Sequence, residues 1–140
     1  MSFGLIIKGV SEVLKELEKQ SERCEGALGA ALYQEGLALD SSAVMQMPVD
    51  TGRMRATHYV TPPEMTRDGP VVEVGCGTDY AIYVHEREEI HHDVGGSKFY
   101  EIPLNEIREG YAERIKDRAS ENLAKGVTMV PIQAPTKPKE

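Results

Sequence analysis

One stretch without proline, residues 10–47, constrains the fold of this 140-residue chain more than any other feature. Ser11 is a suitable N-cap at its start, and Met47 at its end precedes a proline, which excludes that residue from the α region. The stretch predicts a helix over residues 11–46, about 54 Å long at 1.5 Å per residue, which is longer than a small globular domain needs. Its apolar residues recur every three, four or seven positions, as on one face of a helix, and form the stripe Val10, Leu14, Leu17, Cys24, Leu28 and Ala31.

Three glycines lie within this predicted helix: Gly26, Gly29 and Gly36. Each costs a helix up to about 1 kcal/mol relative to alanine. They therefore predict either a kink or the close approach of another helix, and the sequence leaves both open.

The two cysteines, Cys24 and Cys76, lie far apart and form no C-x-x-C pair. In an acidic chain this is typical of reduced thiols in a cytosolic compartment. Cys24 is on the apolar stripe and is expected in the core. Cys76 lies between two glycines at a predicted strand end, where a tight turn needs small residues, and we prefer that explanation to a catalytic thiol.

The middle of the chain predicts a turn and two strands. Residues 48–53 predict the turn, because aspartate and threonine accept local hydrogen bonds and glycine permits an unusual φ. Alternation predicts a half-buried strand over residues 54–61, in which His58 falls on the apolar side. A polar loop over 64–70 leads to a second strand over 71–74, so the two strands predict an antiparallel hairpin.

Two more helices are predicted after the hairpin. A short helix includes residues 80–84, with Thr78 or Asp79 as its N-cap. A charged, histidine-rich segment separates it from a last helical region over residues 97–125, which Gly126 ends.

These elements together predict an α+β fold: a long N-terminal α-helix, a small antiparallel sheet, a short helix and a C-terminal helix. We expect a single domain over residues 1–126. Residues 127–140 contain three prolines and no periodicity. They predict a flexible, extended Pro-rich C-terminal arm.

The charge balance excludes several classes of function. Sixteen Lys and Arg against 23 Asp and Glu give a net charge of −7, which argues against binding nucleic acid through a basic face and against an anionic membrane surface as partner. No run approaches the ~20 apolar residues of a membrane span, and the N-terminus lacks the pattern of a secretory leader, so we expect a soluble protein. Aromatic residues make up 6% of the chain and tryptophan is absent. A chain with so few large aromatic side chains forms a small core, which predicts elongated elements or partner subunits that bury the remaining apolar surface.

One segment concentrates imidazole and carboxylate groups, which are ligands of divalent metals: His85, Glu86, Glu88, Glu89, His91, His92 and Asp93. A small metal-dependent hydrolase using His85, His91, His92 and Asp93 is therefore an alternative function. The spacing matches no zinc signature, because there is no H-E-x-x-H motif and no cysteine nearby. We expect no metal or cofactor and place the histidines in an interface loop.

Four further residues are candidates for an interface between subunits. Arg53 and Arg55 follow the predicted turn, and in a chain of charge −7 an intersubunit ion pair suits them better than nucleic acid. Tyr80 and Tyr83 share a face of the short helix. Core packing is the default for such a pair, although tyrosine is also favoured at interfaces.

The turn and strand ends carry a resemblance to a known family. Residues 48–55 (PVDTGRMR) after a long helix resemble the "A/M-P-V-D-T-G-x-L-R" signature of the neck proteins of tailed phages, which are the head–tail joining and tail-completion proteins, or minor tail components. In the same order, Val72–Gly75 with Thr78 resembles "V-x-V-G-t", and residues 80–86 resemble "Y-A-x-Y-V-E". Residues 98–104 resemble "K-F-L-x-x-P/A-L". The resemblance spans about Val10 to Lys125, and the chain departs from it after His85-Glu86, where the family has a Gly-Thr turn.

The resemblance implies a non-enzymatic virion protein at the neck, where head meets tail, assembled in the host cytoplasm. It implies a homo-oligomeric ring of six or twelve subunits that contacts adjacent neck proteins, such as the connector or adaptor and the tail terminator. Genome DNA would pass through the lumen without specific binding, which suits an acidic subunit. An acidic module that mimics DNA is a further alternative motivated by the same charge.

The resemblance also implies roles for individual residues. Pro48, Asp50, Thr51 and Gly52 would fix the turn that redirects the chain from the long helix into the sheet. Contacts to neighbouring subunits would come from helix and loop surfaces, and the C-terminal arm would reach a neighbouring ring.

Overall fold

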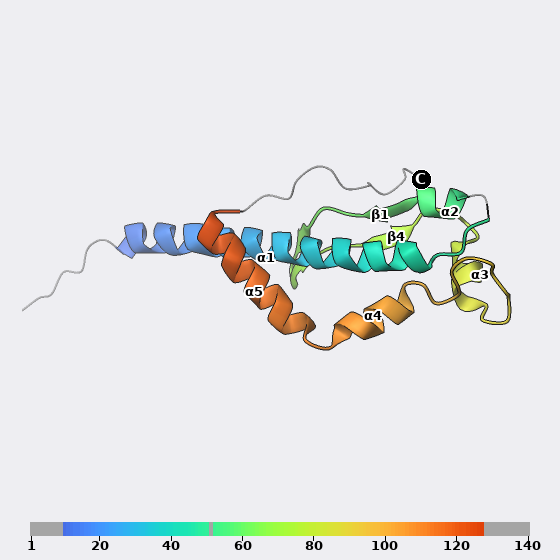
Figure 1. Ribbon diagram of the computed structural model, residues 1–140. Coiled ribbons are helices and arrows are strands. Elements are labelled where there is room, and N and C mark those ends of the chain that lie inside the picture. The colour runs from blue at the N-terminus through green and yellow to red at the C-terminus, as the bar shows by residue number, and fades with distance from the viewer. Residues whose placement is uncertain (1–9, 51, 128–140) are drawn as a thin grey trace, which may run out of the picture.

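The computed structural model describes residues 10–50 and 52–127. The first element, α1 (Val10–Gln46), is a continuous helix of 37 residues that runs along most of the described structure, and α3 lies beyond its C-terminal end (Figure 1). It ends where the sequence predicts, since Pro48 follows within two residues. Its N-terminal part extends beyond every other described element (Figure 1). No helix of the described residues is long and apolar enough to cross a membrane.

The sheet is smaller than predicted, and both of its strands have other bounds than the sequence predicts. β1 (His58–Val60) pairs antiparallel with β4 (Val74–Cys76), so the predicted hairpin is confirmed, although its strands are short. Residues 54–56 are not strand: they belong to a single helical turn, α2 (Arg53–Ala56). An alternating tetrapeptide cannot distinguish one turn of helix from a strand, and here Ala56 N–H donates to Gly52 O at 3.0 Å.

The predicted polar loop contains a second hairpin. β2 (Glu64–Thr66) pairs antiparallel with β3 (Gly69–Val71) around a turn at residues 67–68. The predicted strand over 71–74 is therefore wrong in its bounds, since residues 72–73 lie between two strands that pair with different partners.

The described residues after β4 contain three helices, of which the sequence predicts two. α3 (Ala81–Glu86) is the expected short helix, but no side chain caps it, and Ala81 N–H instead bonds Thr78 O at 3.1 Å. The predicted last helix is divided into α4 (Glu101–Arg108) and α5 (Tyr111–Lys125) by Gly110 at φ 72°. Gly126 ends α5 in the left-handed region as predicted, and the N–H of the next residue returns to Asn122 O at 2.8 Å.

The core lies along the middle and C-terminal part of α1, against α5 and the sheet. The buried face of α1 consists mainly of small residues, which allow close packing of its neighbours: Ala27, Ala30, Ala31 and Ala43. A second cluster, next to the C-terminal end of α1, joins Met47, Met54, Ala81 and Phe99. The mixed α+β class is thus confirmed.

The predicted apolar stripe is only partly the buried face. Leu14, Leu17, Cys24 and Leu28 are exposed, so Cys24 is not the core residue that the stripe predicts. Two of the helix glycines, Gly29 and Gly36, mark close approach of the sheet region rather than of another helix. A Cβ at Gly36 would lie 3.1 to 3.5 Å from three valine side chains, and one at Gly29 would lie 3.2 Å from Pro63 Cβ. The arm predicted for residues 127–140 lies, apart from Val127, outside the described residues.

Candidate functional site

The turn residues and the histidine-rich segment meet around one polar hollow of about 460 Å³, here called the turn pocket. The structure therefore brings together most residues that the sequence singles out. Thr51 lies outside the described residues. The pocket is lined by Pro48, Val49, Asp50, Gly52, Arg53, Met54, Tyr80, Val84, His91, His92 and Asp93.

The turn itself is fixed by backbone geometry and one arginine. Gly52 adopts φ 76°, a left-handed conformation that favours glycine. Arg55 Nε and Nη2 donate to Met47 O at 3.1 and 2.7 Å, and Nη2 also reaches Met45 O at 3.3 Å. A cation that binds the last carbonyls of a helix also stabilises the helix dipole. Arg55 thus holds the end of α1 to α2 within the subunit, a role different from the predicted intersubunit ion pair.

The histidine-rich loop is held against the end of α1 by main-chain bonds. Val49 N–H donates to Val94 O at 3.3 Å, and Gly96 N–H donates to Gln46 O at 2.9 Å. Gly95 lies between them at φ 78°, where a Cβ would approach Gln46 O and Met47 O to 2.5 Å. The loop crosses the main chain at the end of α1 at this point, and only glycine leaves room for it. This close approach fixes the loop next to the turn.

His85, His91 and His92 do not converge on one site. His91 Nε2 lies 3.8 Å from Asp93 Oδ1, and both side chains are at least 90% exposed. His92 Nε2 is buried without a hydrogen-bond partner among the described residues. Within the described part of the chain no three His, Cys, Asp or Glu side chains form a group that could hold a metal ion. The histidine cluster therefore gives no geometric support to the hydrolase alternative.

His85 belongs to a different environment. Its ring packs edge-on against Phe99 with centroids 4.9 Å apart, and Nδ1 lies 2.8 Å from Glu86 Oε1. Lys98 Nζ donates to Glu86 Oε2 at 2.5 Å. Hydrogen bonds from Lys98 and then His85 lower the pKa of the Glu86 carboxyl. These contacts attach α3 to the segment that precedes α4.

The two tyrosines are not core residues, although core packing is the default expectation for them. Tyr80 lines the turn pocket and Tyr83 is largely exposed on α3. Ile82 is exposed beside them. The outer surface of α3 is thus uncovered in the described part of the subunit, in keeping with a place for these tyrosines at an interface.

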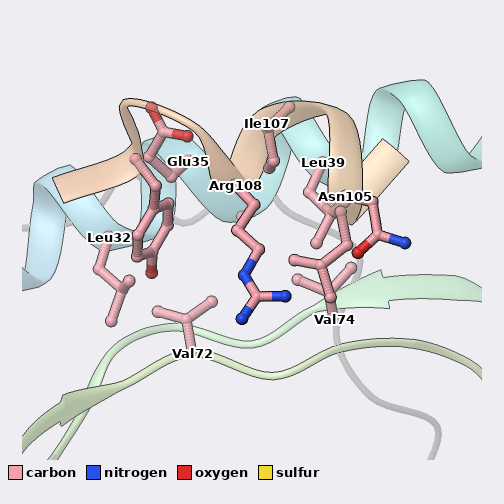
Figure 2. Close-up of a pocket in the computed structure, with 11 residues that line it drawn as sticks. Leu32, Glu35, Leu39, Val72, Val74, Asn105, Ile107 and Arg108 are labelled. Carbon is pink, nitrogen blue, oxygen red and sulfur yellow. The ribbon is translucent and has the colours of Figure 1, made fainter. Parts of the chain in front are cut away.

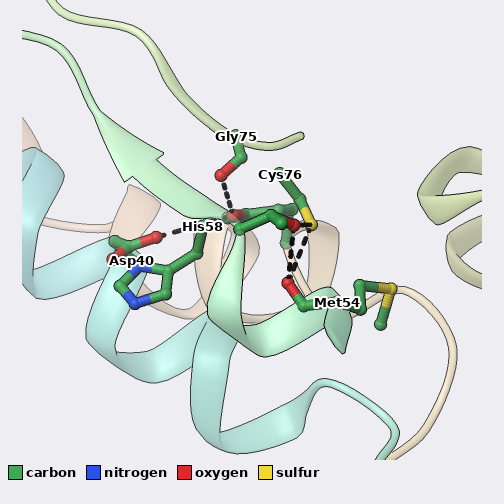
Figure 3. A network of polar contacts seen from close by, with 7 residues as sticks. Asp40, Met54, His58, Gly75 and Cys76 are labelled. Atoms are coloured by element: carbon green, nitrogen blue, oxygen red, sulfur yellow. Dashed lines mark hydrogen bonds and ion pairs between the residues drawn. The ribbon is translucent and has the colours of Figure 1, made fainter. Parts of the chain in front are cut away.

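A partly buried polar network beside the turn is not predicted by sequence reasoning. His58 Nδ1 lies 2.7 Å from Oδ2 of Asp40, and the Tyr100 hydroxyl donates to Gly75 O at 2.8 Å (Figure 3). Burial raises the pKa of Asp40, and the neighbouring His58 opposes that shift. Burial is also the main cause of the raised pKa of Tyr100, followed by the charge of Asp40. The available signal was a pair of polar residues at otherwise buried positions, Asp40 on α1 and His58 on its strand.

Cys76 lies opposite His58 in the β1–β4 pairing but does not form a catalytic pair with it. Its thiol donates to Met54 O at 3.2 Å and lies 3.3 Å from Thr57 Oγ1. Figure 3 shows His58 directed toward α1 and Cys76 directed toward Met54. The thiol, acting as a donor, links the strand to α2.

Comparisons of the chain with protein-family models, with curated proteins and with solved structures give no match. The functional conclusion therefore depends on the residues and geometry described above. Together these define a fixed helix–turn–sheet junction with a polar pocket, flanked by uncovered apolar surface.

Proposed function

We propose that this protein is a non-enzymatic structural component of the bacteriophage neck. It joins head to tail, completes the tail and forms a homo-oligomeric ring around the DNA channel. The observation that carries the proposal is the junction between α1 and the sheet. Its residues Pro48, Gly52 and Arg55 are those of the "P-V-D-T-G-x-L-R" resemblance, and they fix the direction in which the chain leaves α1.

The distribution of apolar side chains supports a role in assembly. Exposed apolar residues gather at the start of α1 and on α3, far apart along the molecule (Figure 1). Contiguous apolar patches on a subunit surface mark sites of protein contact. A subunit with separate contact surfaces is suited to a closed ring, because it can present different surfaces to the neighbours on its two sides.

The net charge supports a ring through which DNA passes without being bound. With a net charge of −7, a ring of six or twelve copies repels phosphate and does not retain the genome in its lumen. The turn pocket, with Tyr80 and His92 at its wall, provides a separate surface for an adjacent neck protein such as the connector or tail terminator.

The proposal is tested in the phage that encodes the chain. A nonsense mutation in the gene should leave filled heads and complete-length tails that do not join, and adding the purified protein to the lysate should restore infectious particles. A Gly95→Ala variant, which disturbs the loop at the turn, should restore fewer particles than the matched Gly96→Ala variant. Normal joining without the protein would refute the proposal.

A further inference from the structure

A second hollow, of about 420 Å³, lies between α1, the sheet and α4 (Figure 2). It is called the α4 groove here. A cavity of about 150 Å³ holds a benzene molecule, so this one has room for several aliphatic side chains. Its walls are mostly apolar, with Leu32, Leu39, Val72, Val74, Leu104 and Ile107 among them.

One cation enters this apolar groove. The Arg108 side chain extends from α4 toward Val72 (Figure 2) and forms no hydrogen bond or ion pair with the residues that the structure describes. The nearby acid Glu35 is not its partner, because it is bound by Arg114 Nε at 3.2 Å and Arg118 Nε at 3.4 Å. The groove therefore fits an occupant that is apolar and carries an acidic group at its border.

The start of α1 has that chemistry. Val13, Leu14 and Leu17, here called the projecting stripe, are 58%, 59% and 60% exposed. Glu18 lies four residues after Leu14 and borders the stripe on the same face of the helix. It forms no ion pair with any described residue, so its carboxylate is available to a neighbour.

The stripe cannot enter the groove of its own subunit. Both belong to the continuous helix α1, in which Leu17 lies about 22 Å from Leu32 at 1.5 Å per residue. A straight helix does not fold back on itself. Contact between the two surfaces therefore requires a second copy of the chain.

We propose that the projecting stripe of one subunit occupies the α4 groove of the next, with Glu18 paired to Arg108. The surfaces in contact are different patches of the same chain, so the interface is heterologous and repeats from copy to copy until a ring closes. An amphipathic helix in an apolar groove is a recurrent mode of recognition. This inference rests on the proposed ring, for which it identifies the contact between subunits.

Charge reversal tests the contact in the full chain by sedimentation velocity over micromolar to millimolar concentration. Arg108→Glu and Glu18→Arg should each weaken self-association about tenfold or more, and the double variant should recover most of it. Arg67→Glu, an equal charge change on the exposed β2–β3 turn, is the matched control and should have no effect. Leu14→Glu should also abolish association, whereas Met65→Glu on the hairpin should not.

Disulfide trapping gives an independent readout. In a Cys24→Ser background, Leu14→Cys combined with Leu104→Cys should yield intermolecular disulfides between positions 14 and 104. Disulfides between two copies of position 14, or none at millimolar concentration, would overturn the contact.

If the wild type associates and the charge variants associate equally well, the contact is refuted while the ring itself stands. A chain that stays monomeric refutes the contact too, and joining of heads and tails then decides the proposed function separately.

Discussion

Replacement of Gly95 by alanine should destabilise the protein more than any other single-methyl change at the turn. Its φ of 78° lies in the left-handed region, which costs an L-residue about 1–2 kcal/mol. The added Cβ would also lie 2.5 Å from two main-chain carbonyl oxygens at the end of α1, which cannot rotate away as a side chain can. Forced overpacking of this kind costs about 1–3 kcal/mol. Together the two effects predict a loss of about 2–5 kcal/mol in the free energy of unfolding.

The neighbouring glycine provides the control. Gly96 has no positive φ, and a Cβ there meets nothing within 4 Å, so Gly96→Ala should change the free energy of unfolding by less than about 1 kcal/mol. Urea unfolding followed by far-UV circular dichroism measures both variants, with the slope m compared to check that the native state is equally compact. If the free energies of unfolding of the Gly95→Ala and Gly96→Ala variants differ by less than about 0.5 kcal/mol, the loop does not cross the end of α1 as described. The geometry of the turn pocket is then wrong.

Three further predictions concern two ion pairs within the subunit and its C-terminal segment. His58→Ala should lower the free energy of unfolding by about 1–3 kcal/mol at neutral pH, because it leaves the Asp40 carboxylate buried without its partner. Burial raises the pKa of Asp40 above its unfolded value, so protonation of the carboxyl at lower pH removes this penalty. Urea unfolding of both proteins should therefore show the difference shrinking as the pH is lowered toward about 4. Arg114→Ala should lower the melting temperature more than Arg118→Ala, because Arg114 also donates to two main-chain carbonyls at the α4–α5 junction, and calorimetry of the two variants tests the order. Removal of residues 128–140 should leave the melting temperature nearly unchanged yet impair head–tail joining, and a large drop in melting temperature would instead make this segment part of the core.

The sequence predicts those elements whose ends carry local signals. α1 ends before Pro48 and α5 ends at Gly126 because proline and left-handed glycine act on the backbone directly. The break at Gly110 is missed, since the apolar spacing of Leu104, Ile107 and Tyr111 continues across it. Periodicity describes side chains and does not detect a change in backbone direction.

Periodicity also fails to say what covers a helix face. The stripe that includes Leu14 and Leu17 has helical spacing, but the described subunit covers a neighbouring face built from alanines such as Ala27 and Ala30. An apolar stripe that a partner buries has the same sequence pattern as one that the subunit buries itself. The long helix was therefore predictable, whereas the side that forms the core was not.

The candidate site was predicted in its parts but not in its assembly. The turn residues and the loop histidines are recognisable by residue type, yet their meeting in one pocket depends on the crossing at Gly95. The Asp40–His58 pair was missed because its partners lie on elements whose contact only the tertiary fold establishes.

Location in the virion tests the central claim most directly. A cryo-EM reconstruction of the phage neck, with the chain identified by a fused tag or by immunogold, should place a ring of six or twelve copies at the head–tail junction around the DNA channel. The same map would show whether the start of each α1 lies against α4 of the next subunit. Label on the capsid shell or at the tail tip, or its absence from purified particles, would contradict the proposed function.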